Sequence, residues 1–457
     1  MSANPEGISS RLPRKLGAWT GAAVVVGVII GSGIYKIPSD VAHLTGSLSG
    51  VALVWILGGL ISLFGALSIA ELAAMFPDAG GPYVYLREAF GRPLAFMFGW
   101  MWLITTPNAW AAQAVTFADY FGTSVAFTAF EKQLLAALLI TLLSGVSYCS
   151  VNLGAWVQNL STGIKLVALA GLAVVLFVFA PHTGSSLATP GSGHIIWSGI
   201  GVALIASLWA YDGWVNITPL SGEMKRPQTT LPRALIYGTL VTLAVYLIMN
   251  AAFAAALPFH ALASSKAVAS DAVTAVLGPG AAVVIVILVM ISTFGSMNGS
   301  ILSDPRVFYA MAEDGLFLRS VGKVHPRFQT PYVAIVFSWA LAMVFLFCRN
   351  FLDLAEAYVL GIWPFLALST IGLYVLRRRR PELARPYKVW GYPFVPMLFV
   401  LGTFLVISDT YYEHFRTHPL DTGFSLALIL VGLPVYWIWT WYQRRTPESS
   451  NRAAGLK

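Results

Sequence analysis

The sequence predicts an all-α membrane protein, a bundle of twelve transmembrane helices that forms a single domain over residues 1–457. Three observations predict this fold. Of the 457 residues, 57% are apolar and only 11% are charged, whereas soluble domains carry about 25% charged residues. The apolar residues gather in twelve stretches close to the length of about 20 residues that a helix needs to cross a bilayer. No linker or low-complexity segment divides them.

The twelve stretches follow one another with short polar connections. They cover residues 17–45, 50–76, 93–121, 133–152, 156–180, 197–221, 234–257, 280–305, 331–348, 353–376, 393–411 and 423–443. If the N-terminus is cytoplasmic, 22 of the 28 Lys and Arg residues lie in cytoplasmic segments, which is the excess that cytoplasmic loops carry. We therefore expect a multi-pass protein of the cell inner (plasma) membrane with cytoplasmic tails, residues 1–14 and 444–457.

The same distribution explains the net charge of +8 without a nucleic-acid partner. The basic run Arg377 to Arg380 is interpreted as an anchor beside anionic membrane lipid. Cys149 and Cys348 lie near the ends of apolar stretches and suit neither a disulfide framework nor a metal site. We expect membrane lipid as a partner, no cofactor and no metal, and the sequence leaves the oligomeric state open.

The first stretch is interrupted midway by Gly31-Ser32-Gly33, and Pro38 closes it. A nucleotide-binding fingerprint is excluded, because that motif requires Gly-x-Gly-x-x-Gly after a strand. Two interpretations remain. Gly27 and Gly31 form a small-xxx-small pair suited to close helix packing, or the helix unwinds here around a ligand. A second break, in the sixth stretch, favours unwinding.

The fifth stretch, residues 156–180, contains Lys165 about ten residues from its start. A lysine inside a membrane costs roughly 2.5–3.5 kcal/mol on insertion scales, so it is a functional candidate by default. The alternative is that the side chain extends back to the cytoplasmic interface and has a purely local role.

The sixth stretch, residues 197–221, is also interrupted, because Asp212 and Gly213 lie near its middle and Pro219 follows. Asp212 has three candidate roles: it faces a cationic group of a substrate, binds a proton, or caps the second half-helix. Trp209 lies three residues earlier and is interpreted either as an aromatic gate or as simple packing.

Two interrupted helices about five stretches apart are typical of transporters built from inverted repeats, which bind substrate at the breaks. We expect repeat one at about 15–180, repeat two at about 197–376 and appended helices at 393–443. An unwound turn leaves backbone groups unpaired, which in lipid costs several kcal/mol each. Half-helix N-termini suit a carboxylate and C-terminal carbonyls suit an ammonium. A zwitterionic amino acid presents both.

The eighth stretch, residues 280–305, carries Ser292, Ser296 and Ser300 on one helix face. These serines either line a path or bond to carbonyls of their own helix. The sequence contains no His-Glu-x-x-His, no phosphate-binding loop and no Gly-x-Ser-x-Gly, and none of its seven histidines suits a proton relay. The pattern predicts a transporter rather than an enzyme and disfavours an ATP-driven pump.

Motifs across most of the chain carry a family resemblance. They are Gly31-Ser32-Gly33-Ile34-Tyr35 with Pro38, Glu71-Leu72 to Phe76-Pro77 with Gly80-Gly81, Ala210-Tyr211-Asp212-Gly213-Trp214 to Gly222-Glu223, Leu231-Pro232-Arg233-Ala234, Phe294-Gly295-Ser296 with Asn298-Gly299-Ser300, Arg306, Gly315, and His325-Pro326 to Thr330-Pro331. Together they resemble the L-type amino acid transporter branch of the amino acid-polyamine-organocation superfamily, in its bacterial single-chain form.

The resemblance implies a LeuT-like fold, that is, a 5+5 inverted repeat with broken helices 1 and 6 plus helices 11 and 12. It also implies sodium-independent exchange of neutral, and also cationic, amino acids by alternating access. By position, Ser32, Gly33 and Ile34 would meet the substrate α-carboxylate. The α-amino group and the side chain would be surrounded by Trp209, Ala210 and Gly213.

The resemblance further implies roles in gating or coupling. Lys165 matches a lysine whose ammonium stands where sodium-coupled relatives bind sodium, and it would tie the first break to the eighth helix. The remaining candidates for gating or coupling are Asp212, Ser292, Ser296 and Trp209.

Three departures qualify the resemblance. Trp209 stands where many relatives have Phe, and Asp212 occurs in relatives of differing specificity, so it does not decide the substrate. Residues 122–132 contain no cysteine, so no covalently linked heavy chain is expected. Two alternatives stay open: a proton-coupled amino acid or amine symporter, with Asp212 or Lys165 as the proton acceptor, and a non-transporting membrane amino acid sensor.

Overall fold

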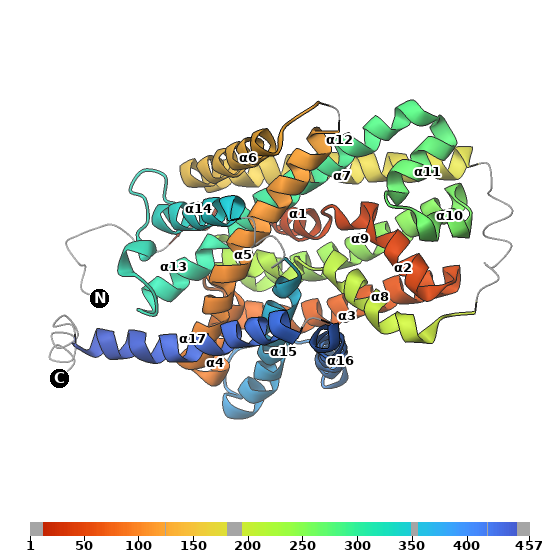
Figure 1. The fold of residues 1–457 in the computed structure, drawn as a ribbon. Helices are drawn as coiled ribbons and strands as arrows, with labels where there is room; N and C mark the ends of the chain where they lie inside the picture. Colours follow the sequence, from red (N-terminus) through yellow and green to blue (C-terminus); the bar gives the residue numbers. More distant parts are fainter. Residues whose placement is uncertain (1–11, 124, 181–193, 349–354, 418, 446–457) are drawn as a thin grey trace.

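The computed structural model describes residues 12–123, 125–180, 194–348, 355–417 and 419–445. Within these ranges the chain is helical and has no β-strand, apart from a single bridge between Leu16 and Met224. Figure 1 shows a bundle of long helices in which α1 lies near the middle. Helix α1 packs against α7, α9 and α12. The predicted all-α fold is confirmed.

In the described residues, each of the twelve predicted stretches coincides with helical structure, and residues 353 and 354 of the tenth stretch lie outside the described ranges. The corresponding elements are α1 (Ala18–Ile29) with α2 (Ile37–Thr45), α3 (Leu48–Met75), α5 (Arg92–Phe121), α6 (Ala129–Cys149), α7 (Val151–Phe179), α8 (Trp197–Ala210) with the 3-10 segment η2 (Trp214–Glu223), α9 (Pro227–Ala256), α12 (Ala282–Ser303), α14 (Tyr332–Phe347), α15 (Ala355–Arg379), α16 (Phe394–Thr417) and α17 (Pro419–Arg445). In the described ranges, seven segments are long and apolar enough to cross a membrane, judged by length and composition. The count of twelve crossings stays a prediction.

Four short helices fall where the sequence indicated only connections. They are α4 (Pro82–Phe90), α10 (Phe259–Ser264), α11 (Val268–Leu277) and α13 (Pro305–Glu313). None has the length of about 20 residues that a crossing requires, so a search for long apolar stretches passes over them. Helices α4 and α13 both pack against α5, and α10 and α11 pack against α9.

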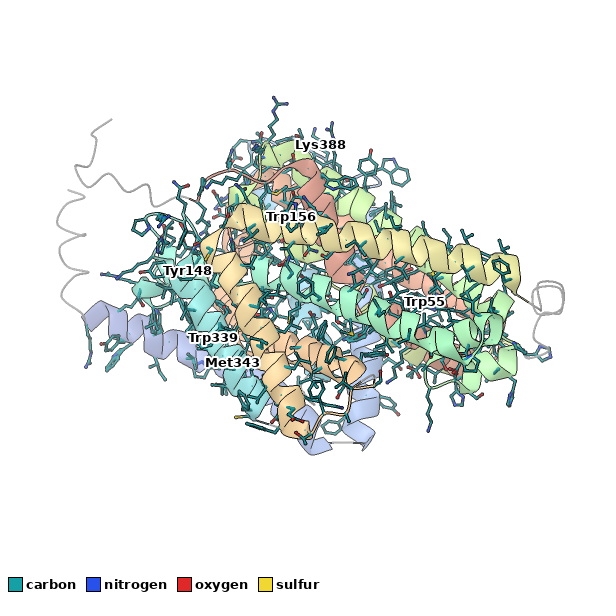
Figure 2. All side chains as sticks on the ribbon, turned by 90° about the horizontal axis from the view of Figure 1, so that it is seen from above. Trp55, Tyr148, Trp156, Trp339, Met343 and Lys388 are labelled. Atoms are coloured by element: carbon teal, nitrogen blue, oxygen red, sulfur yellow. The ribbon has the colours of Figure 1, made fainter. Side chains whose placement is uncertain are left out.

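The outer surface of the bundle is apolar, as a surface in contact with lipid must be. Figure 2 shows Trp156 on the outside of α7, where it is 59% exposed, whereas Trp55 on α3 is completely buried. Many other large apolar side chains are exposed on α6, α7, α16 and α17. Soluble monomers rarely expose contiguous apolar surface on this scale, so the bundle is a membrane protein.

Ion pairs and backbone bonds close one end of the bundle, which we call the basic end and define by Lys15, Arg87, Arg306 and Arg377. Arg306 pairs with Glu223 at 2.7 Å, and both side chains are completely buried. The N–H groups of Lys15 and Leu16 each donate to the Glu223 carbonyl at 2.9 Å. This end of the bundle is therefore tightly joined across α1, η2 and α13.

Two further ion pairs join neighbouring helices at the basic end. The Arg87 guanidinium contacts the Asp314 carboxylate at 2.5 Å, and Arg377 contacts Glu71 at 2.6 Å. Tyr83 also donates to Asp314, at 2.7 Å. Burial, together with the negative charge of Asp314, raises the pKa of the Tyr83 phenol, so the phenol keeps its proton and this hydrogen bond into the alkaline range.

Candidate functional site

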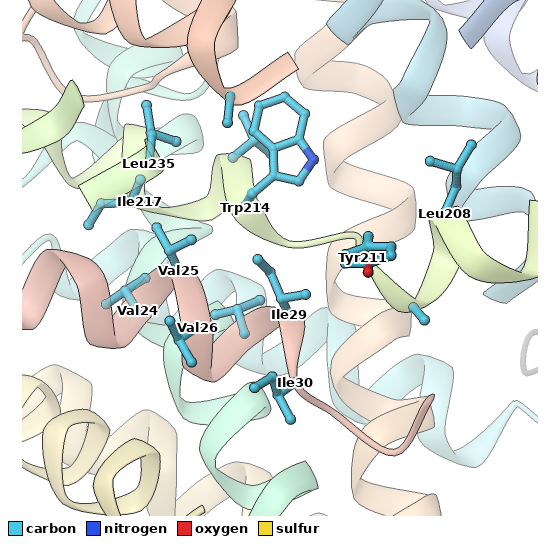
Figure 3. Packing of buried hydrophobic residues seen from close by; sticks show 14 of the residues in the cluster. Val24, Val25, Val26, Ile29, Ile30, Leu208, Tyr211, Trp214, Ile217 and Leu235 are labelled. Carbon is cyan, nitrogen blue, oxygen red and sulfur yellow. The ribbon is translucent and has the colours of Figure 1, made fainter. Parts of the chain in front are cut away.

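Both predicted breaks are present, and they lie against each other. Helix α1 ends at Ile29 and the chain resumes as the short 3-10 turn η1 (Gly33–Tyr35) before α2. Helix α8 ends at Ala210, and η2 begins at Trp214. Figure 3 shows the unwound chain between Tyr211 and Trp214 passing beside Ile29.

Gly213 makes this contact between the breaks possible. Its φ of +108° lies in the left-handed region, which side chains other than glycine rarely adopt. A Cβ atom at this position would lie 2.7 Å from Val28 Cγ1 and 3.2 Å from the Ile29 nitrogen. Gly27 serves packing, because a Cβ there would meet Gln158 and Thr162 of α7 within 2.3 Å. At Gly31 the nearest atom would be 3.7 Å away, so the close-packing interpretation holds for Gly27 alone.

Lys165 of α7 is buried behind the first break. Its side chain is 1% exposed. The ammonium nitrogen donates to the carbonyl of Gly27 at 2.9 Å and to that of Ser292 at 3.1 Å, and it also donates to the carbonyl of Ile30. The alternative in which Lys165 extends to the membrane interface is therefore wrong. The lysine links α7, α12 and the unwound end of α1.

Hydroxyl groups also donate to carbonyls at the end of α1. Ser292 donates to the Ile30 carbonyl at 3.2 Å and Ser296 to the Val28 carbonyl at 2.8 Å. The Tyr246 hydroxyl lies 3.0 Å from the Ile29 carbonyl oxygen and 2.9 Å from that of Ala210, so it bridges the two breaks. The suggestion that these serines bond to their own helix is wrong for Ser292 and Ser296, because their partners lie on α1.

The N–H groups that follow the break are placed differently. In the described part of the chain, the backbone N–H groups of Ser32, Gly33 and Ile34 have no acceptor. The next two N–H groups, those of Tyr35 and Lys36, donate to the carbonyls of Ser32 and Gly33. The first N–H groups of a helical turn are without intrahelical partners, and two of these residues, Ser32 and Gly33, line a cavity.

A cavity of about 130 Å³ lies between the two breaks. A single water needs roughly 10–15 Å³ of such space, so the cavity suits a small molecule rather than a peptide. Its lining comes from α1, α5, α8, η2 and α12, and is made up of Val28, Ile29, Gly31, Ser32, Gly33, Thr105, Thr106, Ala109, Ala112, Gln113, Trp209, Ala210, Asp212, Gly213, Asn216, Thr293, Ser296, Ser300 and Asp304.

Two carboxylates belong to this lining. The indole N–H of Trp363, on α15, donates to Asp212 at 3.1 Å. Gly213 occupies the N-cap position of η2, and the capping role considered for Asp212 stays a prediction. Asp304, between α12 and α13, accepts hydrogen bonds from Trp110 at 2.8 Å and from Asn216 at 3.2 Å.

Comparison with known proteins decides the family. A family model described as amino acid permease matches residues 16–436. The chain belongs to the amino acid permease family. The permease is 32% identical to the serine/threonine exchanger SteT of Bacillus subtilis (strain 168), over 93% of this chain and 97% of SteT.

Animal relatives are similar over comparable lengths. Identity is 31% to the b(0,+)-type amino acid transporter 1 of Mus musculus, over 95% of the permease and 91% of that protein. It is 29% to the cystine/glutamate transporter of Homo sapiens, over 95% and 87% respectively. The permease is thus a transporter rather than an enzyme, and the predicted family branch is confirmed.

The structure brings most of the predicted site residues of the permease together, in two layers. The residues that line the cavity are Ser32, Gly33, Trp209, Ala210, Asp212, Gly213 and Ser296. Ile34, Lys165 and Ser292 are buried and do not line it. Ile34 can contribute its N–H group only, and Lys165 and Ser292 act on the carbonyls of the break from behind.

Sequence reasoning missed the residues that α5 and the end of α12 contribute to the cavity of the permease. Thr105, Thr106 and Gln113 lie on α5, where Pro107 inside the helix and the polar residues beside it were the signal that could have found them. Asp304 offered a signal, because it is an acidic residue at the end of a predicted span, but no motif distinguished it. In the described part of the chain, no group of three or more His, Cys, Asp or Glu side chains could hold a metal ion.

Proposed function

We propose that this permease is a sodium-independent exchanger of amino acids that works by alternating access between its two inverted repeats, residues 15–180 and 197–376. One observation carries the proposal. The two breaks line a small cavity, and among the described residues the N–H groups that follow the first break have no acceptor, while both breaks also contribute carbonyl oxygens. This is the complement of a zwitterion.

The α-carboxylate of the substrate is assigned to the N–H groups of Ser32, Gly33 and Ile34. These groups lack protein acceptors, and the start of a helical turn carries partial positive charge. The α-amino group is assigned to the carbonyl oxygens of the α1 end and of Ala210. A carbonyl oxygen has two lone pairs, so a carbonyl that accepts from Tyr246 or Ser296 retains a site for an ammonium.

Sodium independence is supported by the position of Lys165. Its ammonium sits among three carbonyl oxygens, those of Gly27, Ile30 and Ser292. Oxygen ligands of this kind also suit a hard metal cation. A built-in positive charge at this point removes the need for a bound sodium ion.

Exchange, rather than uptake alone, is supported by the relatives. SteT is a serine/threonine exchanger, and the permease matches it over nearly its whole length. We propose neutral amino acids as substrates, with cationic ones as a second class. Trp209, which is 43% exposed and lines the cavity, is assigned to the gate on the side opposite the basic end.

We further propose the orientation and setting of the permease. The basic end faces the cytoplasm, because Lys and Arg are enriched in cytoplasmic segments, and the membrane is the cell inner (plasma) membrane. The closed ion pairs at this end support an outward-facing arrangement. The chain acts without a covalently linked heavy chain, since the segment 122–132 offers no cysteine.

The test is transport of radiolabelled amino acids by the purified protein in proteoliposomes. Uptake is measured with and without internal amino acid, with and without sodium, and with and without a proton gradient. Uptake that requires internal amino acid and ignores both ions is the expected result. Uptake into empty vesicles driven by a proton gradient would instead establish a proton-coupled symporter, and binding without any transport would establish a sensor.

A further inference from the structure

The cavity contains a carboxylate that the proposed mechanism does not use. Asp304 is 1% exposed and lines the cavity at the junction of α12 and α13. It stands at the N-cap position of α13, where an aspartate ordinarily accepts from the first N–H groups of the helix. Its side chain makes no such hydrogen bond. The carboxylate turns away from the helix that it could cap.

The side chains that do contact Asp304 are neutral. One carboxylate oxygen accepts from the Trp110 indole and the other from the Asn216 amide. Each carboxyl oxygen therefore has one neutral donor and keeps lone pairs for a further donor. Arg306, two residues away, makes its ion pair with Glu223 and acts on Asp304 through its charge alone, without a hydrogen bond. A buried charge is costly unless an opposite charge faces it.

The cavity side of this carboxylate offers further acceptors. Asn216 is 4% exposed, and its amide oxygen is buried without a hydrogen-bond partner, while its nitrogen is held by Asp304. The amide oxygen of Gln113 is likewise buried without a partner. Both residues line the cavity, and no Lys, Arg or His appears in its lining. Orphaned buried acceptors indicate that a ligand with several donors belongs here.

We infer that Asp304 and Asn216 form a subsite for a positively charged group on the substrate side chain, an ammonium or a guanidinium. The inference rests on the proposed function, because it presumes that an amino acid occupies the cavity. A cationic group supplies the carboxylate with a positive charge in direct contact, and it supplies the amide oxygen with a donor. A hydroxyl group would supply one donor and no charge. A side-chain carboxylate would be repelled.

The experiment is competition in proteoliposomes. The assay measures how strongly unlabelled lysine, 2,4-diaminobutyrate, leucine or glutamate inhibits the exchange of radiolabelled alanine, in the wild type and in Asp304→Asn. The asparagine keeps the volume of the side chain and removes its charge. Asp271→Asn is the matched control, because Asp271 lies on α11 and contacts Ser265 outside the cavity. Folding of each variant is checked by gel filtration in detergent.

We expect lysine or diaminobutyrate to compete in the wild type and glutamate not to compete. In Asp304→Asn, the half-inhibiting concentration of the cationic competitor should rise by about tenfold or more relative to that of leucine, the factor expected for one charge-assisted hydrogen bond. The control variant should keep the wild-type ratio. If Asp304→Asn no longer transports, thermal stabilisation of the detergent-solubilised variant by lysine and by leucine gives the same comparison.

Other outcomes overturn the inference and are distinguishable from one another. An unchanged ratio in a folded Asp304→Asn variant removes Asp304 from the subsite. Loss of pH-dependent or sodium-dependent uptake in the variant, without a change in the ratio, assigns Asp304 to a proton or a metal cation instead. If the wild type exchanges no amino acid at all, the proposed function itself fails, whatever the variant does.

Discussion

Replacement of Lys165 is the sharpest test of how the first break is held. In Lys165→Met the side chain keeps most of its volume and loses its charge and its donors. The Ile30 carbonyl keeps the Ser292 hydroxyl as a donor. The Ser292 carbonyl lies inside α12 and so keeps its partner within that helix. The carbonyl of Gly27 loses its donor, since the N–H of Gly31 is directed to Ile29.

The magnitude follows from these contacts. One buried carbonyl left without a partner costs about 1–3 kcal/mol, and a hydrogen bond to a charged group contributes about 1.5–3 kcal/mol. A loss of about 2–3 kcal/mol from one state of the transport cycle shifts its population by about 30- to 150-fold. We therefore expect the exchange rate of Lys165→Met to fall by at least about tenfold, while binding of substrate is weakened as well.

The assay is counterflow of radiolabelled amino acid in proteoliposomes, with the amount of folded protein measured in the same preparation. Lys36→Met is the matched control, because Lys36 lies in the same unwound segment and is exposed. The control should exchange at nearly the wild-type rate. Wild-type exchange in an equally folded Lys165→Met variant would refute the role assigned to this lysine.

Three further changes test the contacts around the breaks. Gly213→Ala should abolish exchange and lower the melting temperature in detergent, because its Cβ would collide with α1 at a positive φ, whereas Gly163→Ala, with no atom within 4 Å, should leave both unchanged. Tyr246→Phe removes the hydroxyl between the two breaks and should reduce exchange by about tenfold, the effect of roughly 1.5 kcal/mol. Tyr237→Phe, on the exposed side of the same helix, is the control and should leave exchange unchanged. Equal loss of exchange in both variants would count against the bridging role. Arg306→Gln leaves its buried glutamate partner without a counter-charge and should destabilise the folded protein by about 3–5 kcal/mol, measured as the shift in thermal unfolding; an unchanged transition would show that the pair is dispensable.

The order of the helices and the two breaks could be predicted from the sequence. Each apolar stretch became helical because about 20 apolar residues in lipid must satisfy their backbone groups within the segment. The breaks were visible because Gly31-Ser32-Gly33 and Asp212-Gly213 place residues that disfavour helix in otherwise apolar surroundings. The family resemblance then assigned Ser32, Gly33, Trp209, Ala210 and Gly213 to one site.

Partners across the bundle could not be predicted in this way. Lys165 was identified as unusual from its position, and only the family resemblance linked it to the first break and the eighth helix, because its carbonyl acceptors on α1 and α12 lie more than a hundred positions away in the sequence. The role of Asp304 was missed for the same reason. At the sequence level it is an acid beside a proline at a helix start, and only the packing of α5 and η2 against it turns it toward the cavity.

The sequence by itself determined what depends on local composition: a membrane protein, helices of bilayer length, two interrupted segments and a basic side. The tertiary structure alone decided which groups meet at the breaks. Periodicity and hydropathy act along one helix, whereas the donors and acceptors of an unwound turn are satisfied by whichever helices pack beside it. The cavity, the lysine behind it and the carboxylate within it are therefore properties of the packed bundle.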